Sequence, residues 1–192
     1  MDVMNPNYPD GLSEMTKADR RNVVDHYKAM HEDWIKADLN TKRLPFVVVC
    51  ENFVNDFNIA TTIRNCNAFS AREITIVGDR RYDRRGTVGT HVYENIHHEE
   101  KLMTTLDKYR QEDYTIVAVD NVAPAVDVFE YTWNPKTVMV LGQEQVGLSN
   151  EALFAADDIV FIPMTGSTRS LNVGVASGIM MAQYVQQIRR SK

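Results

Sequence analysis

Residues 162–187 read IPMTGSTRSLNVGVASGIMMAQYVQQ, and the interpretation of the whole chain starts from this stretch. Its first residue, Ile162, is the end of a mostly apolar run, 158–162, that is typical of a buried strand. Pro163 ends that strand because proline has no amide hydrogen to donate to a ladder. After a polar loop with Gly166, Ser170 stands where a helix N-cap is expected, since its hydroxyl can accept from unpaired first-turn amides. The sequence therefore predicts a strand, a loop and a helix in direct succession.

Two apolar stripes run along the helix predicted from residue 171 onward. Each stripe repeats at helical spacing, so the helix is expected to pack on two sides. Three small residues lower its intrinsic helix propensity, which indicates that another element, such as a second subunit, packs closely there. The stripes are Leu171, Val175, Ile179, Ala182 and Val185, and Val173, Ala176, Met180 and Tyr184, and the small residues are Gly174, Ser177 and Gly178.

Apolar, strand-like runs alternate with helical patterns from residue 45 onward. Such alternation predicts an α/β domain whose sheet is mostly parallel and flanked by helices. Ligands of these sheets bind beyond the carboxyl ends of the strands, where three polar loops fall, 52–58, 142–149 and 163–172. The expected strands are 45–51, 73–77, 114–119, 136–141 and 158–162, and the expected helices are 55–69, 99–111, a short one ending at 154 and the last one from 171.

The first 44 residues precede this pattern and form an N-terminal helical arm. Thr16 and Asp19 make a capping box, and the segment from there to Leu39 is predicted as one helix with an apolar side. This helix either packs against the domain or contacts a substrate, and the packing role is the favoured interpretation. The expected division is an arm at 1–44 and an α/β domain at 45–192. The apolar side consists of Val23, Val24, Tyr27, Met30, Trp34 and Ile35.

Length and composition indicate a globular protein of the cytoplasm. The chain has 192 residues, of which 44% are hydrophobic and 24% charged, values that are ordinary for one soluble domain with an arm. No apolar run reaches the roughly 20 residues of a membrane span, and the N-terminus does not resemble a signal peptide. Cys50 and Cys66 stand in apolar contexts typical of reduced core thiols. The net charge of −5 argues against indiscriminate nucleic-acid binding but leaves room for a local basic patch.

Several common types of site are not supported, because a required residue, motif or geometry is missing. The loop 142–149 resembles a P-loop, but Leu148 occupies the position of its lysine. No G-x-G-x-x-G turn follows the first strand, so a Rossmann dehydrogenase is excluded. The run 97–100, His-His-Glu-Glu, is expected to be a surface helix entry and not a metal site, because adjacent side chains point apart. Ser170 has no histidine in a relay position, so a hydrolase triad is not supported.

The loop after residue 78 concentrates positive charge in an acidic chain. Guanidinium groups suit phosphate contacts, and an aromatic ring suits base stacking. The alternative is a solvated loop whose charge is balanced by Asp79 and Asp83. The RNA-binding interpretation is favoured, since an acidic chain gains nothing obvious from this cluster. Its residues are Arg80, Arg81, Arg84 and Arg85, with Tyr82 between them.

Three blocks of the chain together resemble the SPOUT class of RNA methyltransferases, in its SpoU/TrmH branch. Residues 52–69, with Asn58 and Arg64, resemble the family pattern N-x-G-N-I-x-x-x-x-R-x-x-x-x-F. Residues 140–149 resemble LG-x-E-x-x-GLS. Residues 162–173 resemble IPM-x-G-x-x-x-SLNV. The blocks come in the family's order, the third is the most specific, and the N-terminal arm lies outside the match.

The resemblance implies a fold, a cofactor, a partner and an activity. The fold would carry a C-terminal trefoil knot, which is an exception to the rule that chains do not thread loops. S-adenosylmethionine would bind in the knot, RNA (tRNA or rRNA) would be methylated on a ribose 2′-hydroxyl, and a homodimer would share the active site. No metal is implied. The expected cofactor-binding residues are Val119, Asp120, Leu141, Gly142, Gln143, Gly147, Ile162, Met164, Ser170 and Leu171.

The same resemblance places Arg64 at the centre of catalysis, with Asn58, Glu144, Ser170 and Asn172 as its partners. Arginine is often assigned as the base in this family. Removing a guanidinium proton at neutral pH costs about 7 kcal/mol or more. We therefore expect Arg64 to grip a phosphate and stabilise the developing alkoxide, unless a substrate phosphate shares its proton.

Four residues depart from the family pattern without removing a proposed catalytic group. They are Phe53, Phe57, Ser70 and Gly174, and they leave open the substrate and the pose of the cofactor. The alternative function is an RNA-binding or assembly module that has kept the fold and lost catalysis. Loss of Arg64, Ser170 or Asn172 would mark such a module, and all three residues are present.

Overall fold

The computed structural model describes residues 16, 18–51, 55–78, 81–143 and 146–190. Within them, seven strands form one sheet in the order β3-β2-β1-β6-β4-β7-β5, and every neighbouring pair is parallel. This confirms the predicted α/β class, and the sheet is parallel throughout. The strands are β1 (Leu44–Glu51), β2 (Ala71–Val77), β3 (Ile96–Glu99), β4 (Thr115–Val119), β5 (Val126–Asp127), β6 (Thr137–Leu141) and β7 (Asp158–Phe161).

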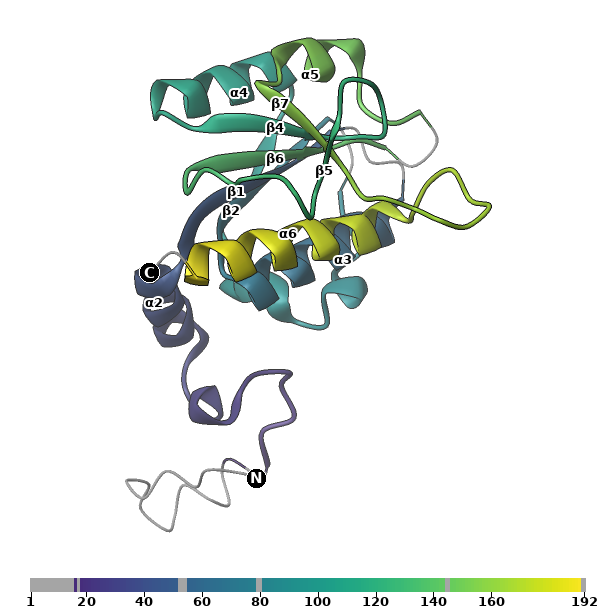
Figure 1. Cartoon of the computed structure of the whole chain (residues 1–192). Helices are drawn as coiled ribbons and strands as arrows, with labels where there is room; N and C mark the ends of the chain where they lie inside the picture. The colour runs from purple at the N-terminus through teal and green to yellow at the C-terminus, as the bar shows by residue number, and fades with distance from the viewer. Residues whose placement is uncertain (1–15, 17, 52–54, 79–80, 144–145, 191–192) are drawn as a thin grey trace.

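Helices cover both faces of the sheet (Figure 1). Helices α4 and α5 lie on one face, and α3 and α6 lie side by side on the other. Their bounds are α2 (Glu32–Lys42), α3 (Asp56–Phe69), α4 (Leu102–Gln111), α5 (Asn150–Ala155) and α6 (Val173–Arg190), with three short 3₁₀ helices η1 (Asp25–Tyr27), η2 (Arg84–Thr87) and η3 (Thr90–Tyr93). No described helix is long and apolar enough to span a membrane.

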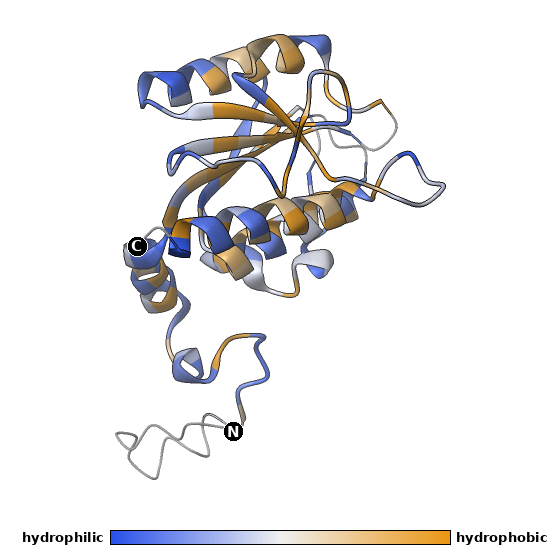
Figure 2. Ribbon diagram, viewed as in Figure 1, coloured by the Kyte–Doolittle hydropathy of each residue, from blue (hydrophilic) through white to orange (hydrophobic). Residues whose placement is uncertain are grey.

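Buried apolar residues form one cluster on each face of the sheet, and the strands are coloured mostly as hydrophobic in Figure 2. Strand β1 is buried from Phe46 to its end because it lies inside the sheet with helices on both faces, as its continuous β-branched run predicts. Cys50 and Cys66 are both buried in this core, and neither is part of a disulfide among the described residues. Burial raises the pKa of Cys66 well above its usual value, so this thiol is a packing residue.

The N-terminal segment is not the single helix predicted for 16–39. Asp19 does not cap a helix, since its carboxylate accepts from the backbone amides of Arg21 at 3.0 Å and of Ala29 at 2.9 Å. Ala29 takes a left-handed conformation, with φ at 65°, and such a residue interrupts a helix. The regular helix α2 begins only after it. Trp34, expected on the apolar side, is 75% exposed, while Ile35 is buried.

The run of two histidines and two glutamates does not enter a helix. Ile96–Glu99 is the edge strand β3, which pairs with β2, and α4 begins only at Leu102. An edge strand with a solvent side accommodates polar residues. His97 approaches Glu73 at 3.2 Å, and the ring of His98 stacks on Tyr82.

Helix α6 starts two residues later than predicted, and Asn172 caps it in place of Ser170. The Asn172 Oδ1 accepts from the Val175 amide at 3.2 Å, which satisfies one of the unpaired first-turn donors. The Ser170 carbonyl instead accepts from the Thr168 hydroxyl at 2.9 Å. The polar loop is therefore longer, and Ser170 stays available at its end.

The two predicted stripes of α6 have different environments. Val173, Met180 and Tyr184 are buried in the core of the same chain, whereas Val175 is 51% exposed. The small residues on α6 pack against α3 of the same chain: a Cβ at Gly174 would lie 2.9 Å from the Thr61 Cγ2 atom.

Candidate active site

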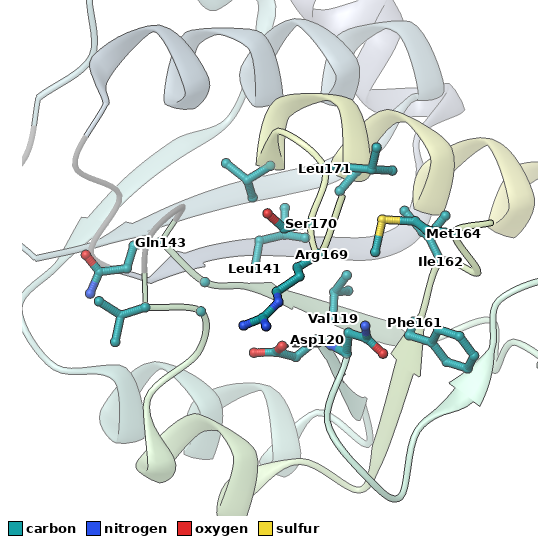
Figure 3. Close-up of a pocket in the computed structure, with 16 residues that line it drawn as sticks. Val119, Asp120, Leu141, Gln143, Phe161, Ile162, Met164, Arg169, Ser170 and Leu171 are labelled. Atoms are coloured by element: carbon teal, nitrogen blue, oxygen red, sulfur yellow. Dashed lines mark hydrogen bonds between the residues drawn. The ribbon is translucent and has the colours of Figure 1, made fainter. Parts of the chain in front are cut away.

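A cavity of about 330 Å³ opens at the carboxyl ends of β4, β6 and β7 (Figure 3). This is the edge at which parallel sheets bind ligands. All ten residues expected to bind the cofactor line this one cavity, although they come from three separated segments. The lining residues are Val119, Asp120, Asn121, Leu141, Gly142, Gln143, Val146, Gly147, Phe161, Ile162, Met164, Arg169, Ser170, Leu171, Val173 and Ala176.

A tight backbone loop after β6 forms one wall of the cavity. Gln143 and Gly147 exchange two backbone hydrogen bonds, of 3.2 and 3.0 Å. Glycine is required at both ends: a Cβ at Gly142 would lie 2.4 Å from the Leu148 amide nitrogen, and Gly147 has φ at +76°. Side chains at these positions would force the loop open. The two glycines, five residues apart, thus allow this tight loop to form. It resembles a P-loop in its glycine spacing but lacks the lysine of a P-loop.

Two carboxylates, from the strands on either side of β6, hold the end of this loop. Asp120, just after β4, accepts from the Leu148 amide at 3.0 Å. Glu51, the last residue of β1, is 4% exposed and accepts from the Ser149 amide at 3.0 Å. Consecutive amides of one loop are therefore bound by charged acceptors on the two strands that flank β6. Hydrogen bonds to charged groups contribute more than neutral ones, about 1.5–3 kcal/mol each. These two bonds fix the end of the loop at Leu148 and Ser149.

The second wall, the loop 162–172, meets α3 at a pair of amides. The Asn172 Nδ2 atom donates to the Asn58 Oδ1 atom at 2.9 Å. Asn58 is buried in the first turn of α3. Two expected catalytic residues that are 114 positions apart are thus in direct contact, and Ser170 lines the cavity beside them.

Arg64 does not line the cavity of its own chain. It lies on α3 next to Asn65, whose amide donates to the Gly174 carbonyl and to the Ser177 hydroxyl at 2.8 and 2.9 Å. Successive helix residues are about 100° apart, so Asn65 faces α6 while Arg64 is exposed. Within the described part of the chain, no hydrogen bond or ion pair engages its guanidinium. Glu144, the remaining expected partner, falls outside the described residues.

Six lining residues were not expected from the sequence, and Arg169 is the most informative. It occupies an unspecified position of the block IPM-x-G-x-x-x-SLNV, so the pattern carries no signal for it. In Figure 3 its side chain points into the cavity toward Asp120. Of the other five, Asn121, Val146, Phe161 and Val173 adjoin expected residues, and Ala176 lies one turn into α6. Glu51, which holds the loop without lining the cavity, was also missed, because a buried strand ending in glutamate has several explanations.

The arginine loop has two unpaired cations among the residues that the structure describes there. Arg81 and Arg84 are exposed. Arg85 forms an ion pair of 2.5 Å with Asp83, and the hydrogen bonds of Arg85 lower the pKa of that carboxyl. Tyr82 is partly buried against the core and stacks on His98, so its ring is not free for a base. Arg80 lies outside the described residues.

Comparison with known proteins decides the family. The model of the SpoU rRNA methylase family matches residues 45–182, which is most of the α/β part and contains all three blocks. The chain belongs to the SpoU rRNA methylase family. Membership confirms the resemblance drawn from the sequence. The chain is an RNA methyltransferase of this family.

Relatives and solved structures agree with this membership. The chain is 28% identical over 172 residues to a tRNA (guanosine(18)-2′-O)-methyltransferase of Borreliella burgdorferi, covering 88% of this chain and 77% of that protein. It superimposes on the TrmH/SpoU tRNA modifying enzyme of A. aeolicus with a TM-score of 0.76 and 25% identity, over 83% of each chain. The SpoU methyltransferase AviRb of Streptomyces viridochromogenes, solved with AdoMet, shares the fold at 24% identity, with a TM-score of 0.70 over 77% of this chain and 59% of that one.

Proposed function

We propose that this chain transfers a methyl group from S-adenosylmethionine to a ribose 2′-hydroxyl of RNA, with tRNA as the first substrate to test. The observation that carries the proposal is the convergence of ten residues from three separated segments, expected from the family resemblance, on one cavity in a member of the SpoU family. Its sequence relatives include a tRNA 2′-O-methyltransferase. The alternative of a non-catalytic RNA-binding module is not favoured, since Arg64, Ser170 and Asn172 are all present.

The cavity fits a nucleoside cofactor in size and in chemistry. About 330 Å³ falls in the range of pockets for ligands of that size. Its walls combine apolar side chains with backbone groups of two tight loops and few polar side chains. Leu141, Ile162, Met164 and Leu171 would contact the adenine and ribose, and the loops 141–147 and 162–172 would supply backbone hydrogen bonds. The bound cofactor would supply an activated methyl group on a sulfonium.

The protein's own contribution is to position the ribose and to stabilise charge. Asn172, fixed by Asn58, and Ser170 would orient the hydroxyl or the guanidinium beside it. Arg64 would bind the adjacent phosphate and stabilise the alkoxide that develops as the hydroxyl loses its proton. Alignment of this kind contributes up to about 7–11 kcal/mol to a group transfer. Glu144 would orient Asn58 or the substrate.

A homodimer would bring Arg64 to a cavity that it does not line in its own chain. Apolar side chains are exposed on α3, on α6 and just before α6: Phe57 is 54% and Val175 51% exposed, and Leu171 at the cavity rim is 36% exposed. Exposed apolar residues on adjacent helices are typical of a subunit interface. Pairing two such faces would bring Arg64 of one subunit to the cavity of the other. The site would then be shared, and each subunit alone would be incomplete.

The trefoil knot is part of the same proposal. Strands β6 and β7 both lie beside β4, and the loops that follow them form the two walls of the cavity. A chain that threads one of these loops through the other before entering α6 would hold both in place. The arm at 1–44 would be a unit of its own that packs on the α/β domain, where Tyr27 and Ile35 cluster with Tyr93. A cytoplasmic location is part of the proposal, because tRNA and rRNA are found there.

Radioactive methyl transfer to tRNA tests the activity and the role of Arg64 together. Arg64→Ala is expected to lower the rate by at least about 100-fold, as does removal of one donor to a developing oxyanion. Arg20→Ala, which removes an exposed arginine of the arm, is the matched control and should leave the rate unchanged. Equal incorporation by the wild type and Arg64→Ala would reject the assignment of Arg64. No incorporation by the wild type into tRNA or rRNA would reject the activity.

A further inference from the structure

The cavity contains one side chain of each charge among its described lining residues, Asp120 and Arg169. Both belong to the walls formed by the ends of strands, and in Figure 3 the guanidinium of Arg169 points toward Asp120. The other lining residues are apolar or uncharged. Asp120 and Arg169 are therefore the side chains of the described lining that can select the charged groups of a ligand.

Arg169 has no partner within the described part of the chain. Its side chain is exposed, and no hydrogen bond or ion pair engages it. A guanidinium has five donors in a planar fork that matches a carboxylate or a phosphate. An arginine that lines a cavity and is not used by the fold is therefore available to bind an anionic group of a ligand.

Asp120 is partly used by the fold but keeps acceptor capacity. Its Oδ1 atom accepts from the Asn121 amide at 2.7 Å and its Oδ2 atom from the Leu148 amide at 3.0 Å. An ionised carboxylate offers about four lone-pair sites, so about two remain for a ligand. These bonds also hold the carboxylate in place, so that it cannot swing across the cavity to neutralise Arg169.

We propose that Arg169 and Asp120 form a subsite for the zwitterionic amino-acid end of the cofactor, in which Arg169 binds the α-carboxylate and Asp120 faces the α-ammonium. The inference rests on the proposed function, which makes S-adenosylmethionine the ligand of this cavity. An RNA phosphate is the competing anion for Arg169. A phosphate would be repelled by Asp120, whereas a zwitterion needs both charges, so the pair of side chains favours the amino acid.

The test compares two ligands that differ only in the carboxylate: S-adenosylmethionine and decarboxylated S-adenosylmethionine. Their dissociation constants are measured by calorimetry with the wild type, Arg169→Gln, and Arg20→Gln as the matched loss of one charge in the arm. Removal of one charged interaction at a partly exposed site corresponds to roughly a tenfold change in affinity. The wild type is expected to bind the decarboxylated ligand about tenfold more weakly. Arg169→Gln is expected to lose about the same factor for S-adenosylmethionine and nothing for the decarboxylated ligand, and Arg20→Gln should match the wild type.

Three other outcomes have distinct meanings. If Arg169→Gln binds S-adenosylmethionine as the wild type does but binds tRNA more weakly, Arg169 contacts phosphate and the inference is overturned while the proposed function stands. If it weakens both ligands by the same factor, it acts on the shape of the cavity and not on the carboxylate, and the inference is again overturned. If the wild type binds neither ligand, both the inference and the proposed cofactor fail. Urea unfolding of Arg169→Gln, expected to match the wild type because the side chain is exposed, separates these cases from misfolding.

Discussion

Arginines at the two ends of the molecule have opposite environments. Arg43, between α2 and β1, is 6% exposed in its side chain, forms an ion pair of 2.8 Å with Glu94, and donates to the carbonyls of Ala71 and Tyr93 at 2.7 Å each. Arg64 and Arg169 are exposed and have no described partner. The first kind of arginine joins the arm to the domain, and the second kind is left for a ligand. Burial and partners, rather than residue type, separate the two.

The largest expected effect is on the buried pair. Arg43→Met leaves the Glu94 carboxylate buried without its counterion, which costs about 3–5 kcal/mol of the free energy of unfolding. Urea unfolding measures this loss. Arg64→Met is the matched control at the other end, and its free energy of unfolding should stay within about 0.5 kcal/mol of the wild type. Equal stability of the two variants would remove the contrast between buried and exposed arginines.

The loss of unfolding free energy in Arg43→Met is expected to depend on pH. Burial raises the pKa of Glu94, opposed first by the charge of Arg43 and then by hydrogen bonds from Asn67 and Arg43. A carboxyl whose pKa is raised on folding binds its proton more tightly in the native state, so its contribution to stability is lost as the pH rises through that pKa. Without Arg43 the pKa rises further. The destabilisation should therefore be greater at about pH 7.5 than at about pH 5.

Unfolding curves at both pH values check this expectation, with Arg43→Met in a Glu94→Gln background as the control. Glutamine does not ionise over this range, so the cost of removing Arg43 from that background should be the same at both pH values. A cost in the original background that does not change with pH would show that Glu94 is not the source of the destabilisation.

A smaller effect is expected at Glu51, a buried carboxylate at the cavity end of the sheet. Glu51→Gln keeps the shape of the side chain but weakens the acceptor of the Ser149 amide, which should cost about 1–2 kcal/mol of unfolding free energy. Because that amide ends the loop at the cavity, affinity for S-adenosylmethionine should fall as well. Glu130→Gln, at an exposed position, is the control. Calorimetry that finds unchanged cofactor affinity would limit Glu51 to a role in stability.

The smallest expected effect is in the arginine loop. Replacing both Arg81 and Arg84 by Gln should weaken tRNA binding and lower the slope of log affinity against log salt by about 0.7–0.9 for each phosphate that the loop no longer neutralises. Arg85→Gln should change the slope less, since Asp83 already pairs with Arg85. Titrations at several salt concentrations measure the slopes. A slope that is unchanged in the double variant would exclude this loop from the RNA-binding surface.

The hydrophobic periodicity of the sequence predicted the strands and helices whose positions depend on burial. The buried strands and α3 were found close to their predicted places because β-branched runs and helical spacing reflect burial directly. The single helix predicted for 16–39 was wrong, since Ala29 in a left-handed conformation leaves no mark in the apolar pattern. The cap of α6 was also predicted wrongly: Ser170 and Asn172 are both good caps, and only the contact between Asn172 and Asn58 distinguishes them.

For the site, the family's blocks predicted which backbone segments converge but not how charge is arranged there. The glycines that close the loop 142–147 stand at fixed positions of a block, and so do Asn58 and Asn172. Arg169 stands at an unspecified position, and Glu51 precedes the first block. Their roles depend on distances across the sheet, which no local pattern encodes. Arg64 was named from the first block, whereas Arg169 became recognisable only once the cavity was seen.

The central claim is that Arg64 of one subunit completes the cavity of another, and mixing two inactive variants tests it most directly. Arg64→Ala and Asn172→Ala remove groups from opposite sides of the proposed interface. After subunit exchange at equal concentrations, half of the dimers would be mixed and one of their two sites intact, so about a quarter of the wild-type methyl transfer should return. A mixture that exchanges subunits but stays as inactive as either variant alone would contradict the account.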